Sequence, residues 1–164
     1  MVLNQFLQKR RRKSLYDMDF HRWTEEQASA LREQRSADID WDNVAEEIGS
    51  LGKSEKRSIE SNLNVVLLHL LKWAYQGDQR KPGWRSSIAE HRQRLLKLVD
   101  ESPSLRGYPE LVLAEEYRLA RVKAADETGL PEHAFPESCP FSIAQVLNSE
   151  FWPTEPKPRS APPA

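Results

Sequence analysis

Four polar residues, spaced seven apart, interrupt a strongly apolar stretch of the chain. They are Glu55, Asn62, His69 and Gln76. On a helix this spacing keeps the side chains on one side, with a drift of about 20° per step. A buried polar group that lacks a hydrogen bond costs about 1–3 kcal/mol. We therefore expect a polar column in the core, with His69 buried and at least one of its ring nitrogens bonded to another element.

A metal-binding or acid–base role for His69 is the alternative to this structural role. Helical di-iron sites use a Glu-x-x-His pair, and no such pair occurs in the sequence. We therefore predict no metal and no cofactor, and we expect the histidine to be paired with Glu46, Glu47 or Tyr117.

Arg85 and His91 suggest a second kind of chemistry. Arginine and histidine separated by five residues are similar to the pattern of HEPN-type ribonucleases, which are also small helical proteins. The histidine would act as general base and the arginine would stabilise the phosphorane. Residues six apart, however, point about 120° away from each other on a helix. A packing role for His91 is the favoured interpretation, and the ribonuclease is the alternative.

The cysteine content and the charge limit the other classes of site. Cys139 is the single cysteine, which excludes an internal disulfide and a cysteine-based zinc site. Nothing near it in the sequence would lower its pKa strongly, so a nucleophile is not expected.

Charged residues make up 30% of the chain, and no apolar run approaches the roughly 20 residues that span a bilayer. No secretory signal is visible. We expect a cytoplasmic protein without a membrane segment.

A basic block near the N-terminus contrasts with the rest of the chain. The net charge is −1, and without the five positive charges of this block it would be −6. Such a block can bind nucleic acid, but a disordered basic leader over residues 1–15 is the favoured interpretation. The block consists of Lys9, Arg10, Arg11, Arg12 and Lys13.

Apolar residues recur at helical spacing along most of the 164 residues, and no segment alternates as a strand does. Asp40 is placed to cap a short helix that ends at Gly52, and Ser54 is placed to cap the next helix. Gly129 predicts a helix stop, and Ser142 opens a capping box. We expect five longer helices, near residues 19–34, 40–52, 54–76, 84–100 and 109–127, and a short one after Ser142.

Apolar stripes on these helices predict their buried sides. The stripe of the first helix contains Phe20, Trp23, Gln27, Ala30 and Leu31. The stripe of the second contains Trp41, Val44, Ala45, Ile48 and Leu51. The stripe of the fourth contains Trp84, Ile88, His91, Leu95 and Leu98.

Several phrases of the sequence together resemble one family, domain-of-unknown-function family 29. The resemblance covers about residues 16 to 153, and it implies a bacterial all-α protein with no established activity. It therefore brings no catalytic residues with it. The phrases are YDMDF from Tyr16, IDWDNVAEEI from Ile39, SLGKSEKR from Ser50, HLLKW from His69, SPSL from Ser102, ETGLP from Glu127, CPFS from Cys139 and FWP from Phe151.

The sequence thus predicts a single-domain all-α bundle over residues 16–153, followed by a disordered proline-rich tail over residues 154–164. Two functions remain open. The first is a binding or interaction module, such as a partner in a toxin–antitoxin or other accessory system, because tryptophan and arginine favour contact surfaces. The alternative is a metal-independent ribonuclease that uses Arg85 and His91.

Overall fold

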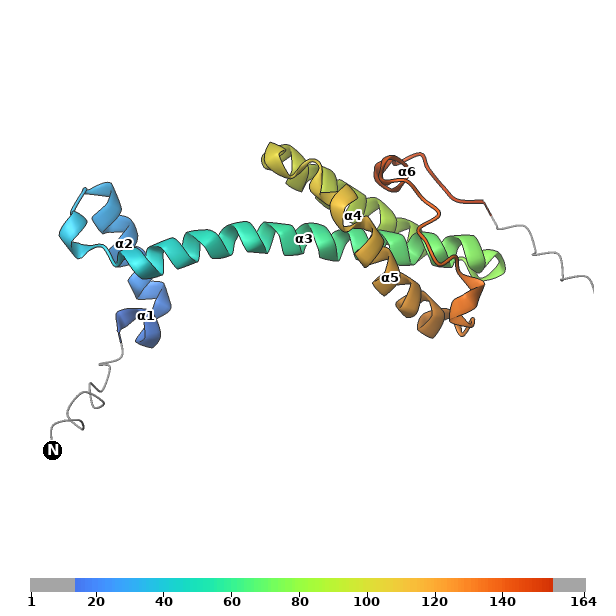
Figure 1. Cartoon of the computed structure of the whole chain (residues 1–164), viewed down its shortest axis with the longest axis horizontal. Coiled ribbons are helices and arrows are strands. Elements are labelled where there is room, and N and C mark those ends of the chain that lie inside the picture. The colour runs from blue at the N-terminus through green and yellow to red at the C-terminus, as the bar shows by residue number, and fades with distance from the viewer. Residues whose placement is uncertain (1–13, 155–164) are drawn as a thin grey trace, which may run out of the picture. The chain divides into compact units, whose positions relative to one another are not determined.

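The structure, a computed structural model, describes residues 14–154, and these form helices and connecting segments without a strand (Figure 1). The predicted all-α class is confirmed. The leader and the tail that the sequence predicts fall almost wholly outside the described residues. Across residues 14–154, no helix combines the length and the apolar character that crossing a bilayer requires.

The chain divides into two compact units, residues 1–52 and 53–164. Every residue of the main hydrophobic core, from Ile59 to Val146, belongs to the second unit. The sequence predicts one bundle over residues 16–153, whereas the main core of the structure lies within the second unit alone. In the first unit, the buried hydrophobic residues among those described are Trp23 and Ala30.

Capping residues set the helix starts of the first unit. Ser14 and Asp17 form a capping box at α1 (Leu15–Met18), and Asp19 accepts a hydrogen bond from the Arg22 amide at the start of α2 (Phe20–Arg32). A 3₁₀ turn, η1 (Ser36–Asp38), then leads to α3 (Trp41–Tyr75).

The predicted break at Gly52 does not occur, because α3 is one continuous helix of 35 residues. Gly49 and Gly52 both lie inside it, and neither has a positive φ. A glycine in a helix interior costs about 1 kcal/mol relative to alanine, which long flanking helical segments can tolerate. The second and third predicted helices are therefore one helix, and the boundary between the two compact units falls at Gly52.

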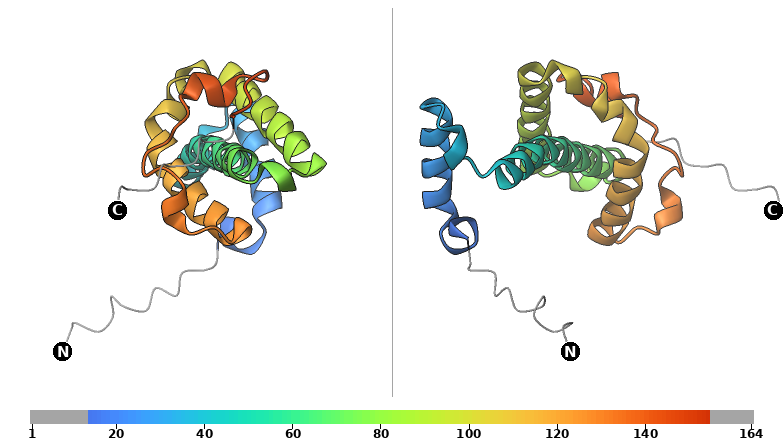
Figure 2. Two further views of the ribbon diagram at one scale, coloured as in Figure 1. Left: turned by 90° about the vertical axis from the view of Figure 1, so that its right-hand side faces the viewer. Right: turned by 60° about the vertical axis from the view of Figure 1, so that its left-hand side comes forward.

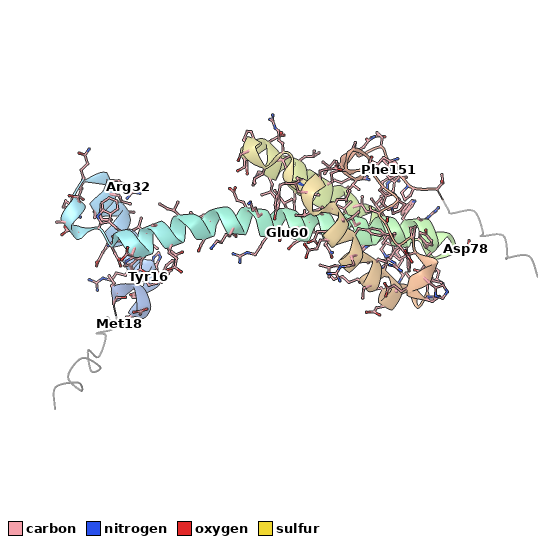
Figure 3. The ribbon with its side chains drawn as sticks, viewed as in Figure 1. Tyr16, Met18, Arg32, Glu60, Asp78 and Phe151 are labelled. Carbon is pink, nitrogen blue, oxygen red and sulfur yellow. The ribbon has the colours of Figure 1, made fainter. Side chains whose placement is uncertain are left out.

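In the second unit, α4 and α5 pack around α3, which Figure 2 (left) shows almost end-on. Figure 3 shows side chains crowded around α3 on the C-terminal side of Glu60. The helices are α4 (Pro82–Glu101), α5 (Tyr108–Thr128) and α6 (Ile143–Leu147), and the 3₁₀ turns are η2 (Gly77–Gln79), η3 (Pro103–Leu105) and η4 (Glu132–Ala134).

Two predicted helix boundaries of this unit are confirmed. Gly129 follows α5 with φ of 70°, the left-handed conformation that favours glycine. Ser142 and Gln145 form the capping box of α6, in which each side chain bonds the backbone N–H of the other residue.

The buried side of α4 differs from the predicted stripe at two positions. Trp84, Ile88 and Leu95 are buried as expected, but the remaining buried residues are Arg92 and Val99. His91 and Leu98 are half-buried. The predicted and the observed buried sides of α4 share Trp84, Ile88 and Leu95. Because His91 and Arg92 both fit the helical spacing of these three residues, the periodicity alone could not show which of the two is buried.

Candidate protein-interaction surface

Three members of the predicted polar column have partners on other elements of the second unit. These hydrogen bonds join α3 and the residue after it to α4, to the residue after α4 and to α5, although Glu55 is exposed and does not lie in the core. The pairs are Glu55 Oε2 with the Ser102 hydroxyl (2.9 Å), Asn62 Oδ1 with His91 Nδ1 (2.7 Å) and the amide of Gln76 with the Thr128 carbonyl (3.1 Å).

His69 is the exception, and the prediction that one of its ring nitrogens bonds another element is wrong. Its side chain is half-buried, and Nδ1 is buried without a hydrogen-bond partner. No other hydrogen bond to this ring is formed among residues 14–154. Burial, followed by the positive charge of Lys72, lowers the pKa of the imidazole, so the neutral form is favoured.

The partners expected for His69 are engaged elsewhere or belong to the other unit. Glu46 and Glu47 lie in the first unit. The Tyr16 hydroxyl donates to Glu47 Oε1 (2.5 Å), and this bond is the main reason that the pKa of Tyr16 rises to about 12. The Tyr117 hydroxyl donates to the Pro136 carbonyl (2.7 Å).

Arg85 and His91 are paired separately. The Arg85 guanidinium lies over the ring of Trp152, 5.5 Å from its centroid. His91 is occupied by Asn62, and burial lowers the pKa of its imidazole. No hydrogen bond or ion pair joins the two residues in the described part of the chain. This arrangement supports the packing role of His91 and gives no support to the ribonuclease.

A buried arginine, which the sequence reasoning missed, organises the C-terminal segment of the second unit. Arg92 is 2% exposed and donates to four backbone carbonyls. Its guanidinium also lies over the ring of Trp152, 5.6 Å from the centroid. The arginine thus holds α6 and the chain after it against α4. The acceptors are the carbonyls of Val146 (2.7 Å), Phe151 (3.0 Å), Gln145 (3.4 Å) and Ser149 (3.5 Å).

Two further buried polar residues of α3 bond to α5, and both were also missed. Lys72 pairs with Glu127 and lies 4.7 Å from the centroid of the Trp84 ring. Asn64 donates to the Glu116 carbonyl (3.0 Å) and accepts from Lys123 (2.7 Å). The available signal was a polar residue on an otherwise apolar helix, which the sequence analysis applied only to the residues spaced seven apart from Glu55 to Gln76.

The remaining chemical candidates give no site. Burial is the main cause that raises the pKa of Cys139, and its thiol donates to the Phe141 carbonyl (3.3 Å), so the cysteine is not an activated nucleophile. Within residues 14–154, no group of three or more histidine, cysteine or acidic residues is placed to hold a metal ion. The basic block from Lys9 to Lys13 lies outside the described residues.

The feature that does stand out is an exposed apolar surface on the first turns of α3. Trp41, Ile48 and Leu51 are 58%, 64% and 69% exposed. The prediction that this stripe faces a core is therefore wrong. Together with Ala45, Gly49, Gly52 and the half-buried Val44, these residues form a surface that we call the α3 apolar face.

The rest of the first unit is bonded to the side of α3 that carries Asp40 and Glu47, which lies next to Val44 and Leu51 on the helix. The Trp23 indole donates to Asp40 Oδ2 (3.3 Å), and the Gln27 side chain accepts from the Asp40 amide (2.7 Å). Tyr16 packs edge-on against Trp23 (4.8 Å between centroids) and bonds Glu47. These contacts leave Trp41, Ala45, Ile48 and Leu51 exposed and Val44 half-buried, so most of the α3 apolar face is uncovered within this unit.

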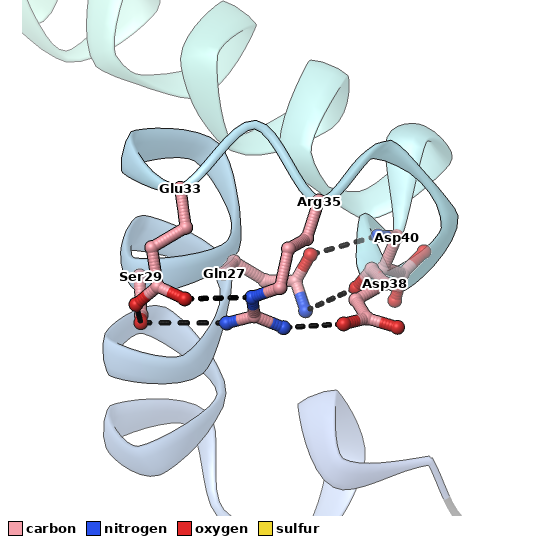
Figure 4. Close-up of polar contacts among 6 residues, drawn as sticks. All are labelled: Gln27, Ser29, Glu33, Arg35, Asp38 and Asp40. Carbon is pink, nitrogen blue, oxygen red and sulfur yellow. Dashed lines mark hydrogen bonds and ion pairs between the residues drawn. The ribbon is translucent and has the colours of Figure 1, made fainter.

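An arginine fixes the turn that sets this arrangement (Figure 4). Arg35 donates to Glu33 Oε2 (2.8 Å), to Ser29 Oγ (3.4 Å) and to the carboxylate of Asp38. Its partners come from both ends of the connection between α2 and α3. The turn is therefore closed by polar bonds rather than by an apolar core.

Gly49 and Gly52 leave two positions of the α3 apolar face without a side chain. A Cβ added at Gly49 or at Gly52 would meet no heavy atom within 4 Å. Alanine would be the better helix former at both positions, so intrahelical stability does not explain the glycines. Close approach of another backbone would explain them.

The comparisons with known proteins identify a family and nothing further. The chain matches the family described as "Domain of unknown function DUF29" over residues 15–152. No curated protein and no solved structure matches the chain. The matched region covers both compact units, from α1 to the segment held by Arg92. This chain therefore belongs to the DUF29 family, whose function is unknown.

Proposed function

We propose that this chain is a protein-interaction module and that the α3 apolar face is its binding surface. The observation that carries the proposal is the exposure of Trp41, Ile48 and Leu51 on one side of a single helix. Soluble proteins rarely leave a contiguous apolar surface uncovered unless it binds something.

The distribution of apolar residues supports the same proposal. Among the described residues, the first unit contributes two of the twenty buried hydrophobic residues but six of the ten large hydrophobics that are exposed. A unit this small has too little core to be stable without help from a partner, a metal or disulfides. The six are Met18, Phe20, Leu31, Trp41, Ile48 and Leu51.

Photo-crosslinking in cells of the native host tests the proposal. A photoreactive amino acid is placed at Ile48, and in a second strain at Leu111, which is 79% exposed on α5 of the second unit. We expect a discrete covalent adduct from position 48 that Leu51→Glu abolishes, and no comparable adduct from position 111. Equal, diffuse labelling from both positions would contradict the proposal.

A further inference from the structure

We infer that the partner of the α3 apolar face is the same face of a second copy of this chain, with the two α3 helices antiparallel. The inference rests on the proposed function and adds the identity of the partner. A two-fold axis through Ile48 relates the two helices, so that the interface is isologous.

The order of large and small residues along α3 fits this pairing. With Ile48 opposite Ile48 of the second copy, Val44 lies opposite Gly52 and Leu51 lies opposite Ala45 of that copy. Val44 and Leu51 thereby each meet a small residue, which lets two helices approach closely. The space that the pairing requires at Gly52 is free in the structure. A parallel pairing would place Val44 opposite Val44 and the glycines opposite each other.

The charges along α3 favour the same orientation. Residues 40–47 contain four acidic side chains and no basic one, whereas residues 53–57 contain three basic side chains and one acidic one. Antiparallel helices bring the acidic end of each copy beside the basic stretch of the other, and parallel helices bring like charges together. Lys53 and Arg57 lie on the far side of α3 from Ile48, so these charges act through the net charge of each stretch rather than through direct pairs across the axis. Complementary charges of this kind specify orientation in paired helices.

Sedimentation equilibrium of the full chain tests the pairing. We expect the mass of two chains for the native protein. Ile48→Glu should raise the dissociation constant by more than about a hundredfold, because two unpaired carboxylates would face each other at the axis. Leu111→Glu is the matched control, since it places the same charge on an exposed leucine of α5 and should leave the mass unchanged.

A second variant separates loss of pairing from loss of folding. Gly52→Leu improves the helix propensity of α3, so its helical circular dichroism should equal or exceed that of the native chain. The leucine nevertheless occupies the space that Val44 of the second copy requires, and the dissociation constant should rise by at least about tenfold. A native chain that stays monomeric overturns the inference, as does a dimer that survives both Ile48→Glu and Gly52→Leu.

Cysteine cross-linking tests the orientation in a background that carries Cys139→Ser. When Val44→Cys and Gly52→Cys chains are mixed and mildly oxidised, antiparallel helices give the mixed disulfide dimer. Disulfides within the Val44→Cys chains alone, without the mixed product, would overturn the antiparallel arrangement.

The in-cell adduct at position 48 keeps the two proposals distinguishable. An adduct with the mass of two chains agrees with both. An adduct with a different protein, or one within a single chain to residues 1–13, overturns the second-copy inference. Of these two results, the adduct with a different protein leaves the interaction module standing, whereas no adduct at all removes the proposed function itself.

Discussion

Replacing Arg92 with methionine should release the C-terminal segment from the second unit. The methionine keeps most of the length and apolar bulk of the side chain but removes every donor. The perturbation therefore targets the four carbonyl contacts and the stacking on Trp152, and it leaves the apolar neighbours of α4 in place.

The expected loss of stability follows from the two shortest contacts. Hydrogen bonds from a charged group are worth about 1.5–3 kcal/mol each, so the bonds to Val146 (2.7 Å) and Phe151 (3.0 Å) account for about 3–6 kcal/mol. The buried guanidinium has no carboxylate partner, so its removal also relieves a desolvation cost, and this gain offsets part of the lost hydrogen-bond energy. After this gain is subtracted, we expect the free energy of unfolding to fall by about 2–4 kcal/mol. For a chain of this length it would lower the midpoint of thermal unfolding by about 4–16 °C.

Thermal unfolding followed by circular dichroism measures this shift, and tryptophan fluorescence reports on Trp152, whose ring lies 4.7 Å from that of Trp73. Arg118→Met is the matched control, because this arginine is exposed on α5. Arg92→Lys should fall between the native chain and Arg92→Met, since one ammonium group cannot reach carbonyls spread over residues 145–151. If Arg92→Met melts within about 1 °C of the Arg118→Met control, the assignment of Arg92 as the anchor of this segment is refuted.

The remaining predictions concern single-residue substitutions. His69→Leu should be neutral or should stabilise the fold by about 1 kcal/mol, because it removes an orphaned nitrogen rather than a bonded one; a clear loss in chemical unfolding would reveal a partner for the imidazole. The same variant should flatten the stability profile below pH 6.5, since a lowered folded-state pKa makes the native chain lose stability as the pH falls from the unfolded value toward the folded one; an unchanged pH profile would contradict this. Arg85→Ala and His91→Ala should leave any RNA-cleaving activity of the purified protein unchanged, and parallel loss in both still-folded variants would restore the ribonuclease. Gly129→Ala should cost about 1–2 kcal/mol because φ is 70° there, whereas Gly49→Ala, at a helical position with free space, should not lower the helix content.

Some predictions failed because a local pattern has more than one tertiary solution. Glycine at position 52 is compatible with a helix end and with a helix interior. In the structure it lies in the interior of α3, which continues on both sides of it. A stripe on α4 that shares Trp84, Ile88 and Leu95 is compatible with either His91 or Arg92 on its buried side. Arginine was the residue buried because carbonyls of the C-terminal segment were available to its donors.

The column on α3 shows the same limit for hydrogen-bond partners. Its spacing correctly indicated polar positions that face other elements, and Asn62 is bonded to a residue of α4. The partner of each member could not be predicted, because the pairing depends on how α4 and α5 cross α3. His69 lies at the same spacing as Asn62, yet no polar group meets its Nδ1.

By itself, the sequence determined the helical class, the helix start at Ser142 and the stop at Gly129. These features depend on hydrogen bonds and backbone angles within a few residues, so local residue types suffice. The tertiary structure decided which sides of the helices are buried, because burial depends on residues far apart in the chain. The apolar stripe from Trp41 to Leu51 has the pattern of a core-facing helix, but α2 and α1 are bonded to its flank at Asp40 and Glu47, and Trp41, Ile48 and Leu51 are left exposed.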